Sequence, residues 1–171
     1  MSPQHYTDFL AQTLIDPATL QNRVRELGEE IGGVPFLVDL MRHITVPHRI
    51  DFMAISSYGA GARESSGNVR VTMDLMTNIQ GRHALLVEDI IDSGNTIASV
   101  LELLGTRQPK SLKVCVLLDK AERREVEVPV HYCGFTIPNA YVFGYGLDID
   151  EYYRNLPFVG VVDLEKYKPD A

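Results

Sequence analysis

Residues 83–105 constrain the fold more than any other part of the sequence. The run HALLVEDII over residues 83–91 is almost continuously apolar until its acidic end, which predicts a buried strand. The small polar residues of Asp-Ser-Gly follow as a turn, and a helix is expected over about residues 95–105. A strand that passes through a tight turn into a helix is the repeating unit of α/β domains.

The rest of the chain continues this alternation. Helices are expected over residues 16–31 and 33–44, and strands over 50–57, 69–75, 112–118, 131–135, 141–143 and 159–163. Together these elements predict an α/β fold with a largely parallel sheet, in one domain over residues 1–171. Residues 58–68 are rich in Gly, Ser and Asn and predict a long mobile loop, of a length that is usually functional or disordered.

Composition narrows the class of protein. The net charge of -7 and the pI near 5.2 argue against broad nucleic-acid binding, although a local phosphate site remains compatible with them. No apolar stretch approaches the ~20 residues of a membrane span, and the N-terminal MSPQHYTDFL lacks a signal-peptide pattern. We therefore expect a cytoplasmic protein that binds no membrane. Cys115 lies in an apolar run and is expected to be a buried, unreactive thiol.

The acidic end of the first strand raises a functional question. Glu88 and Asp89 lie where α/β sheets bind ligands, and carboxylates are costly to bury without partners. The turn and the helix N-terminus after them suit an anion, whereas the two acids suit hydroxyls or a hard divalent cation. A ligand with a phosphate and a diol, such as a ribose 5-phosphate, satisfies both. A capped helix with solvated acids is the alternative; it explains Ser93 and Thr96 but not the paired acids.

Four segments resemble a known family. VEDIIDSGNT at residues 87–96 resembles the phosphoribosyl-pyrophosphate signature of the type I phosphoribosyltransferases, in the form seen in hypoxanthine-guanine phosphoribosyltransferases. Three further segments resemble the family in its order: ISSYG (55–59), LLDKAERR (117–124) and GFTIPNAYVFGYGLDIDEYYRNLP (134–157). The resemblance implies the type I phosphoribosyltransferase fold, with a mainly parallel sheet flanked by helices, a small hood region and a mobile active-site loop.

The resemblance also implies a reaction. It is the Mg²⁺-dependent transfer of the 5-phosphoribosyl group from phosphoribosyl pyrophosphate to N9 of hypoxanthine or guanine, which gives IMP or GMP and pyrophosphate. Glu88 and Asp89 would bind the ribose hydroxyls, and Asp92 would act at purine N7 as a general base or a stabilising charge. The 5-phosphate would be held by Ser93, Gly94, Asn95 and Thr96. Family members often have lysine at position 95, so phosphate binding here would depend more on backbone dipoles.

The remaining roles follow from the same resemblance. Lys120 would contact purine O6, Tyr141 would stack on the base, and the backbone of Val142 would read the base edge. Asp148, with Glu88 and Asp89, would support magnesium. Arg154 would contact pyrophosphate, and the lid over the site would begin with Ser57 and Tyr58. Without the resemblance, Lys120 would be an ordinary exposed lysine, Tyr141 a core aromatic residue, and Asp148 with Arg154 a surface ion pair.

The chain departs from the family at one place. Relatives have a strand and a Leu-Lys-Gly-Gly pyrophosphate loop, whereas here Ile31 runs directly into Gly32 and Gly33. The two glycines are assigned to pyrophosphate. Either the sequence omits a segment, which the intact flanks favour, or the segment is truly deleted, in which case activity and stability would both suffer.

Two other functions remain open at this level. Some proteins of this fold class regulate by binding RNA, and a phosphoribosyltransferase for another base, such as xanthine, is a nearer alternative. Relatives suggest a homodimer or homotetramer, with no nucleic acid or membrane partner. The preference among hypoxanthine, guanine and xanthine depends on backbone acceptors and pocket shape.

Overall fold

The computed structural model describes residues 35–57, 69–150 and 152–167. The helix expected over residues 16–31, the glycines Gly32 and Gly33, the junction at Ile31, and Tyr58 with the loop over 58–68 lie outside these ranges. The chain divides into two compact units. Arg49–Tyr141 is called the first unit, and residues 1–48 with 142–171 are called the second unit. Among the described helices, none has the length and apolar character needed to cross a membrane.

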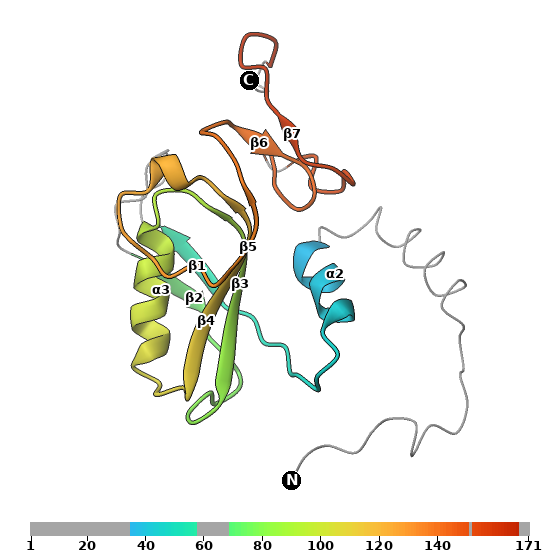
Figure 1. The fold of residues 1–171 in the computed structure, drawn as a ribbon. Coiled ribbons are helices and arrows are strands. Elements are labelled where there is room, and N and C mark those ends of the chain that lie inside the picture. Colours follow the sequence, from blue (N-terminus) through green and yellow to red (C-terminus); the bar gives the residue numbers. More distant parts are fainter. Residues whose placement is uncertain (1–34, 58–68, 151, 168–171) are drawn as a thin grey trace, which may run out of the picture. The chain divides into compact units, whose positions relative to one another are not determined.

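A three-stranded parallel sheet organises the unit of Arg49–Tyr141. It contains β3 (His83–Ile91), β4 (Ser111–Asp119) and β5 (Tyr132–Thr136) in that order, with the helix α3 (Asn95–Gly105) following β3 (Figure 1). The strand expected over 83–91 and the helix expected over 95–105 are confirmed. Because Ile91 pairs with Asp119, the carboxyl ends of β3 and β4 are adjacent. Residues after these two strands are therefore placed side by side.

The core of this unit lies between the sheet and α3. Ile91, Ile97, Val114 and Val116 form one cluster, each at most 4% exposed. The helix contributes Ile97, Val100 and Leu104, which are spaced to share one helical face. Cys115 is buried in β4 as expected, and this burial raises the pKa of its thiol.

A separate two-stranded sheet precedes β3. It pairs β1 (Ala54–Ser57) with β2 (Val69–Met73) in antiparallel orientation. Both strands are shorter than the strands expected over residues 50–57 and 69–75. The Asp51 carboxylate accepts the backbone N–H groups of Met76 and Thr77 at 3.3 and 2.7 Å, which accounts for the late start of β1.

Within the described residues, β3 pairs with β4 alone and does not join the β1–β2 sheet. A sheet that lacks one of its central strands leaves the strands on either side of the gap unpaired with each other. The separation of β3 from the β1–β2 sheet fits that arrangement. The absence of that strand from this chain stays a prediction.

The second unit contains α2 (Pro35–His43) and the short antiparallel pair β6 (Val142–Phe143) and β7 (Gly160–Val161). The helix expected over 33–44 is thus confirmed from Pro35 onward. It packs against the turn after β6, because Pro35 Cδ lies 3.0 Å from where a Cβ of Gly146 would be. The Tyr145 hydroxyl also donates to the Asp39 carboxylate at 2.7 Å.

Candidate functional site

The acid pair at the end of β3 is mostly buried. Burial, and secondarily the charge of Asp89, raise the pKa of Glu88 from 4.5 to about 7. One oxygen of Asp89 accepts the backbone N–H of Ile90 at 2.7 Å. The surroundings of Glu88 therefore favour its protonated form more than water does. A ligand hydroxyl or a cation beside it would favour its ionised form.

The turn that follows is built around Gly94. Its φ of 88° is in the left-handed region, and a Cβ there would meet the Val126 carbonyl oxygen at 2.5 Å. The backbone N–H groups of Glu125 and Val126 both donate to the Ser93 carbonyl, at 2.9 and 3.2 Å. Gly94 is the N-cap of α3, and no side chain makes a capping hydrogen bond. The helix start is thus braced by the segment after β4 and is not capped by a side chain.

The Asn95 side chain is used within this turn. Its amide nitrogen donates to Ser93 Oγ at 3.1 Å and to Glu125 Oε2 at 2.9 Å. These two bonds take both donors of the amide group. The side chain therefore orders the turn, and any anion bound there would depend on backbone N–H groups, as the sequence suggested for a chain that lacks lysine at this position.

Asp92 and Lys120 are brought together by the sheet. Lys120 Nζ lies 3.3 Å from Asp92 Oδ2, and the Lys120 backbone N–H donates to the Ile91 carbonyl at 3.0 Å. The lysine is only 7% exposed, whereas every other buried residue in the described ranges is apolar or glycine. A buried lysine requires a charge partner, so Lys120 is not an ordinary surface lysine.

Arg123 approaches the same carboxylate from its other side. Its Nε lies 3.0 Å from Asp92 Oδ1 as an ion pair, in an alignment that makes no hydrogen bond. Oδ1 is closed to solvent and has no hydrogen-bond partner among the residues described. The two oxygens of Asp92 thus face two different cations.

Arg124 ties the two strand ends together. It forms a buried ion pair with Asp119 at the end of β4, and its Nη1 donates to the Asp92 carbonyl at 3.2 Å. Arg123, Arg124 and Glu125 all support the site, although their sequence pattern predicted no role for them. Two adjacent arginines, three and four residues after Lys120 at the carboxyl end of a strand, were the available signal.

The other predicted residues belong to different parts of the chain. Asp148 and Arg154 form an ion pair at 2.9 Å in the second unit, where Arg154 also donates to the Gly146 carbonyl at 2.9 Å. Val142 is buried in β6, and Tyr141 is 47% exposed, so Tyr141 is not a core aromatic residue. Ser57 is the last residue of β1.

No metal cluster is assembled within the described ranges, where no three His, Cys, Asp or Glu side chains lie close enough together to hold an ion. The adjacent carboxylates of Glu88 and Asp89 nevertheless offer the oxygen ligands that Mg²⁺ prefers. A cation would also offset the burial and, secondarily, the charge of Asp89, which together raise the pKa of Glu88. These two residues therefore fit a magnesium ion as part of its ligand set.

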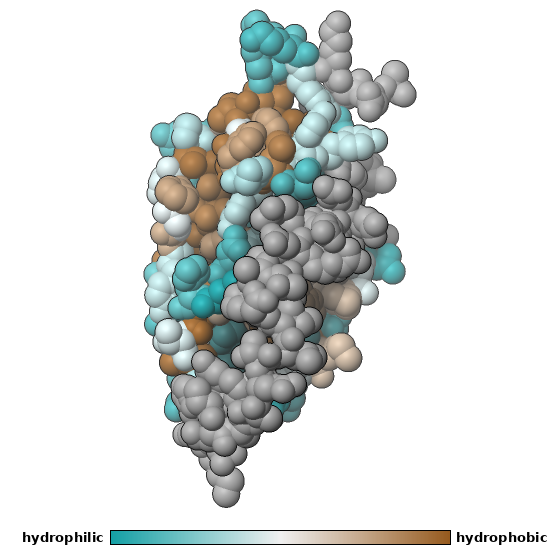
Figure 2. Space-filling model, turned by 90° about the vertical axis from the view of Figure 1, so that its right-hand side faces the viewer, coloured by the Kyte–Doolittle hydropathy of each residue, from teal (hydrophilic) through white to brown (hydrophobic). Residues whose placement is uncertain are grey.

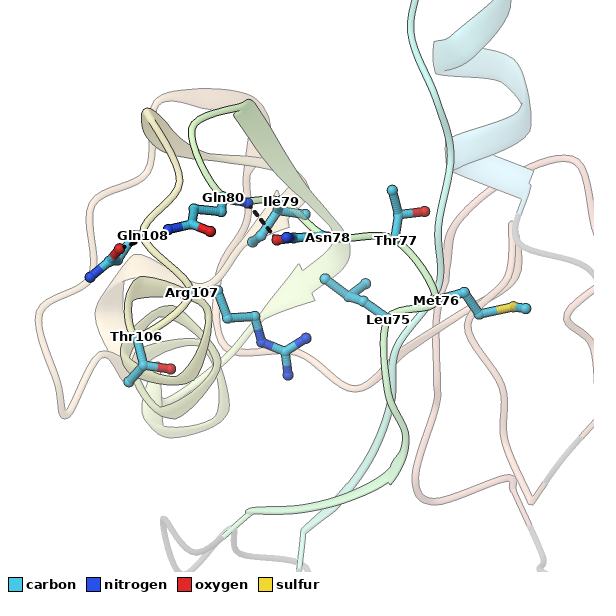
Figure 3. Close-up of a pocket in the computed structure, with 9 residues that line it drawn as sticks. All are labelled: Leu75, Met76, Thr77, Asn78, Ile79, Gln80, Thr106, Arg107 and Gln108. Atoms are coloured by element: carbon cyan, nitrogen blue, oxygen red, sulfur yellow. Dashed lines mark hydrogen bonds between the residues drawn. The ribbon is translucent and has the colours of Figure 1, made fainter.

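A polar hollow of about 500 Å³ lies elsewhere in the first unit, lined by residues 75–80 and 106–108 (Figure 3). It adjoins the start of β3 and the end of α3. At ~3.3 Å per residue, the nine residues of β3 separate it from Asp92 by about 30 Å. Arg107, which lines it, donates to both oxygens of Asp74 at 2.7 and 2.9 Å. The hollow is therefore not part of the acidic site.

Comparisons with known proteins identify relatives over most of the chain. The phosphoribosyl transferase domain family matches residues 27–151. A hypoxanthine phosphoribosyltransferase of Salmonella typhimurium is 45% identical, with 90% of this chain and 96% of the relative covered. A hypoxanthine-guanine phosphoribosyltransferase of Mycobacterium avium is 42% identical, with coverage of 95% and 91%.

Solved structures agree with the sequence relatives. A hypoxanthine phosphoribosyltransferase of Staphylococcus aureus superimposes with a TM-score of 0.75 at 36% identity, over 95% of this chain and 97% of the other. A hypoxanthine-guanine phosphoribosyltransferase of Bacillus anthracis gives 0.72 at 40% identity, over 90% and 99%. These matches confirm the expected type I phosphoribosyltransferase fold.

The alignments also contain gaps on the side of this chain. The alignment with the Salmonella relative runs over 171 positions yet covers 90% of these 171 residues, so about a tenth of its positions have no counterpart here. The relative itself is covered almost completely. A missing internal segment is compatible with these figures.

Proposed function

Because this chain belongs to the hypoxanthine phosphoribosyltransferases of the phosphoribosyl transferase family, we propose that it is a purine-salvage enzyme. It transfers the 5-phosphoribosyl group from phosphoribosyl pyrophosphate to N9 of hypoxanthine or guanine, which yields IMP or GMP and pyrophosphate. The observation that carries this proposal is the buried Lys120 paired with Asp92 beside the glycine turn.

The purine edge accounts for that pair. A 6-oxopurine presents O6 and N7 next to each other on one edge. The Lys120 ammonium donates to O6, and Asp92 Oδ2 accepts a proton at N7 or stabilises the positive charge there. An adenine would place an amino donor against Lys120, so a 6-oxo base is favoured. Tyr141 supplies a stacking face, in keeping with its exposure, and Val142 supplies backbone groups.

The sugar and phosphate are assigned to the end of β3 and the turn. Glu88 and Asp89 accept hydrogen bonds from the ribose hydroxyls. Ser93, Gly94, Asn95 and Thr96 surround the 5-phosphate, mainly through backbone N–H groups at the start of α3. The closeness of the Gly94 backbone to the chain after β4 supports a turn held in one conformation for this purpose.

Magnesium is part of the proposal. Glu88 and Asp89 are its proposed ligands, and Asp148 keeps its assignment to magnesium from the family resemblance. When bound, the ion would neutralise charge on the pyrophosphate leaving group. Arg154 would bind the same leaving group through its guanidinium. Gly32, Gly33, Ser57 and Tyr58 keep their assignments to pyrophosphate and to the lid, from the family resemblance.

The assembly is proposed to be a homodimer or homotetramer. Large apolar side chains are exposed in the second unit, including Phe158 at 54%, Val161 at 66% and Leu164 at 70%. Figure 2 shows that apolar residues, drawn in brown, reach the molecular surface. Such residues are typical of surfaces that bind a partner, which supports self-association. A cytoplasmic location stays a prediction from composition.

The test is pyrophosphate release from phosphoribosyl pyrophosphate with hypoxanthine, guanine, xanthine and adenine as separate acceptors. We expect turnover with hypoxanthine or guanine that depends on Mg²⁺, and none with adenine. The protein should first be checked by intact mass, because a chain with a missing segment would give a false negative for the family. No pyrophosphate release with any of the four bases, from protein whose full length is confirmed by mass, would overturn the proposal. Salt-sensitive RNA binding without turnover would favour a regulator.

A further inference from the structure

We infer that Arg123 is a positioning residue that holds the Asp92 carboxylate in place for the reaction at the purine. The inference rests on the function proposed above. It goes beyond that proposal because Arg123 would contact neither the purine nor phosphoribosyl pyrophosphate and would act through Asp92 alone.

The contacts around Asp92 divide its two oxygens between two cations. Lys120 Nζ is 3.3 Å from Oδ2, and Arg123 Nε is 3.0 Å from Oδ1. Oδ1 is closed to solvent and accepts no hydrogen bond within the described residues, so the Arg123 guanidinium is the charge that compensates it there. Arg124 donates to the backbone carbonyl of Asp92 and not to its carboxylate. The charge of Arg124 is neutralised by Asp119.

Substrate binding makes this division matter. The Lys120 ammonium has three N–H donors, so a bound purine O6 shares it with Asp92 and weakens its hold on Oδ2. Oδ2 then faces N7, and Arg123 remains on Oδ1. The carboxylate keeps one cation and one orientation through the exchange. A glutamine at position 123 would supply neither the charge nor the reach of the guanidinium.

Arg123 is well placed for such a role. It is the last residue of the short 3₁₀ helix Ala121–Arg123. The backbone N–H of Arg123 donates to the Lys120 carbonyl at 2.9 Å and closes the turn. Lys120 and Arg123 are thus fixed to each other by one turn of backbone. The Arg123 side chain is 40% exposed and is not part of the core, so its replacement should leave the fold intact.

The experiment is a double-mutant cycle between Arg123→Gln and Asp92→Asn in the full chain, with kcat and both KM values measured. In the wild-type background we expect Arg123→Gln to lower kcat about tenfold and to leave the KM for phosphoribosyl pyrophosphate unchanged. A tenfold effect lies within the usual range of interaction energies between residues in contact. In the Asp92→Asn background the same change should have no further effect. Arg123→Lys, which keeps a charge, should recover part of kcat.

The matched control is Arg107→Gln, which removes an arginine from a similar ion pair, with Asp74 at 2.7 Å, at the other end of β3. It should leave kcat unchanged. The inference is overturned by an Arg123→Gln variant that has normal kcat, that raises only the purine KM, or that loses as much activity in the Asp92→Asn background as in the wild type. An inactive wild-type protein would instead overturn the proposed function, and the inference with it.

Discussion

Lys120 and Glu88 are two ionisable residues whose surroundings differ from those of an ordinary surface residue, and both lie at the carboxyl ends of neighbouring strands. Lys120 is buried against Asp92, and the pKa of Glu88 is raised to about 7. Buried ionisable groups that converge at a sheet end are typical of functional sites.

Replacement of Lys120 by methionine should weaken purine binding. Methionine keeps most of the side-chain volume but removes the donor to O6, and a hydrogen bond from a charged group is worth roughly 1.5–3 kcal/mol. We expect the KM for hypoxanthine to rise about tenfold or more, with a smaller change in the KM for phosphoribosyl pyrophosphate. Steady-state kinetics with each substrate varied in turn would measure this. A normal purine KM would contradict the assignment of Lys120.

Replacement of Glu88 by glutamine should change how stability depends on pH. The pKa of Glu88 in the folded protein is above its usual 4.5, so its contribution to stability is full below about pH 4.5 and is lost as the pH rises to about 7. Between pH 5 and 8 the wild type should lose about 2–3 kcal/mol relative to Glu88→Gln, since one pKa unit is worth ~1.4 kcal/mol.

Urea denaturation of both proteins at pH 5 and pH 8 would measure this difference, in the absence of Mg²⁺. The exposed Glu127, changed to glutamine, is the matched control and should not alter the pH dependence. Parallel pH profiles for the wild type and Glu88→Gln would show that the burial of Glu88 does not perturb its ionisation.

At the scale of elements, the turn between β3 and α3 and the segment after β4 act as one structure. Ser93 accepts two backbone N–H groups from residues 125 and 126, Asn95 binds Glu125, and Arg124 binds the Asp92 carbonyl. The proposed phosphate turn therefore depends on residues some thirty positions later in the chain. A change at the contact point should affect both stability and substrate binding.

Replacement of Gly94 by alanine tests this dependence. Alanine would be strained at a φ of 88°, and its Cβ would meet the Val126 carbonyl oxygen at 2.5 Å. Strain of this kind costs about 1–3 kcal/mol, so we expect a lower melting temperature and a higher KM for phosphoribosyl pyrophosphate. Gly105→Ala is the control, because a Cβ there has no atom within 4 Å. Equal stability of the two variants would contradict this account of the turn.

At the scale of the whole molecule, β4 is the most deeply buried of the described strands. β4 is paired on both sides, by β3 and β5, and Val114 and Val116 within it are at most 1% exposed. β3 has one described partner, and Leu85 within it is 41% exposed. The interior of the sheet thus lies at β4.

Native-state hydrogen exchange should reproduce this order. Amides of residues 114–118 should exchange most slowly, because they open only when the unit unfolds. Amides of β5, and of the separate β1–β2 sheet, should exchange faster through local opening. Mass spectrometry of peptides after deuterium labelling would measure the order. Slower exchange in β1–β2 than in β4 would show that the chain is stabilised at a different place.

The sequence by itself determined the elements that form around buried apolar runs, and the family. The strand at 83–91 and the helix at 95–105 are correct to the residue, because a continuous apolar run and a glycine turn specify them locally. The sequence also placed Asp92 and Lys120 at strand ends, from which a parallel sheet brings them together. The short strands were less predictable, since their bounds depend on partners such as Asp51 with Thr77.

Only the tertiary structure decided which side chains support the site. The sequence identified Asn95 as a candidate phosphate donor, whereas its amide group binds Ser93 and Glu125. The roles of Arg123 and Arg124 depend on contacts across about thirty residues, which local patterns do not encode. Charge partners of this kind are chosen by the register of β3 against β4. That register is fixed by packing of the whole sheet and is not specified by any one segment.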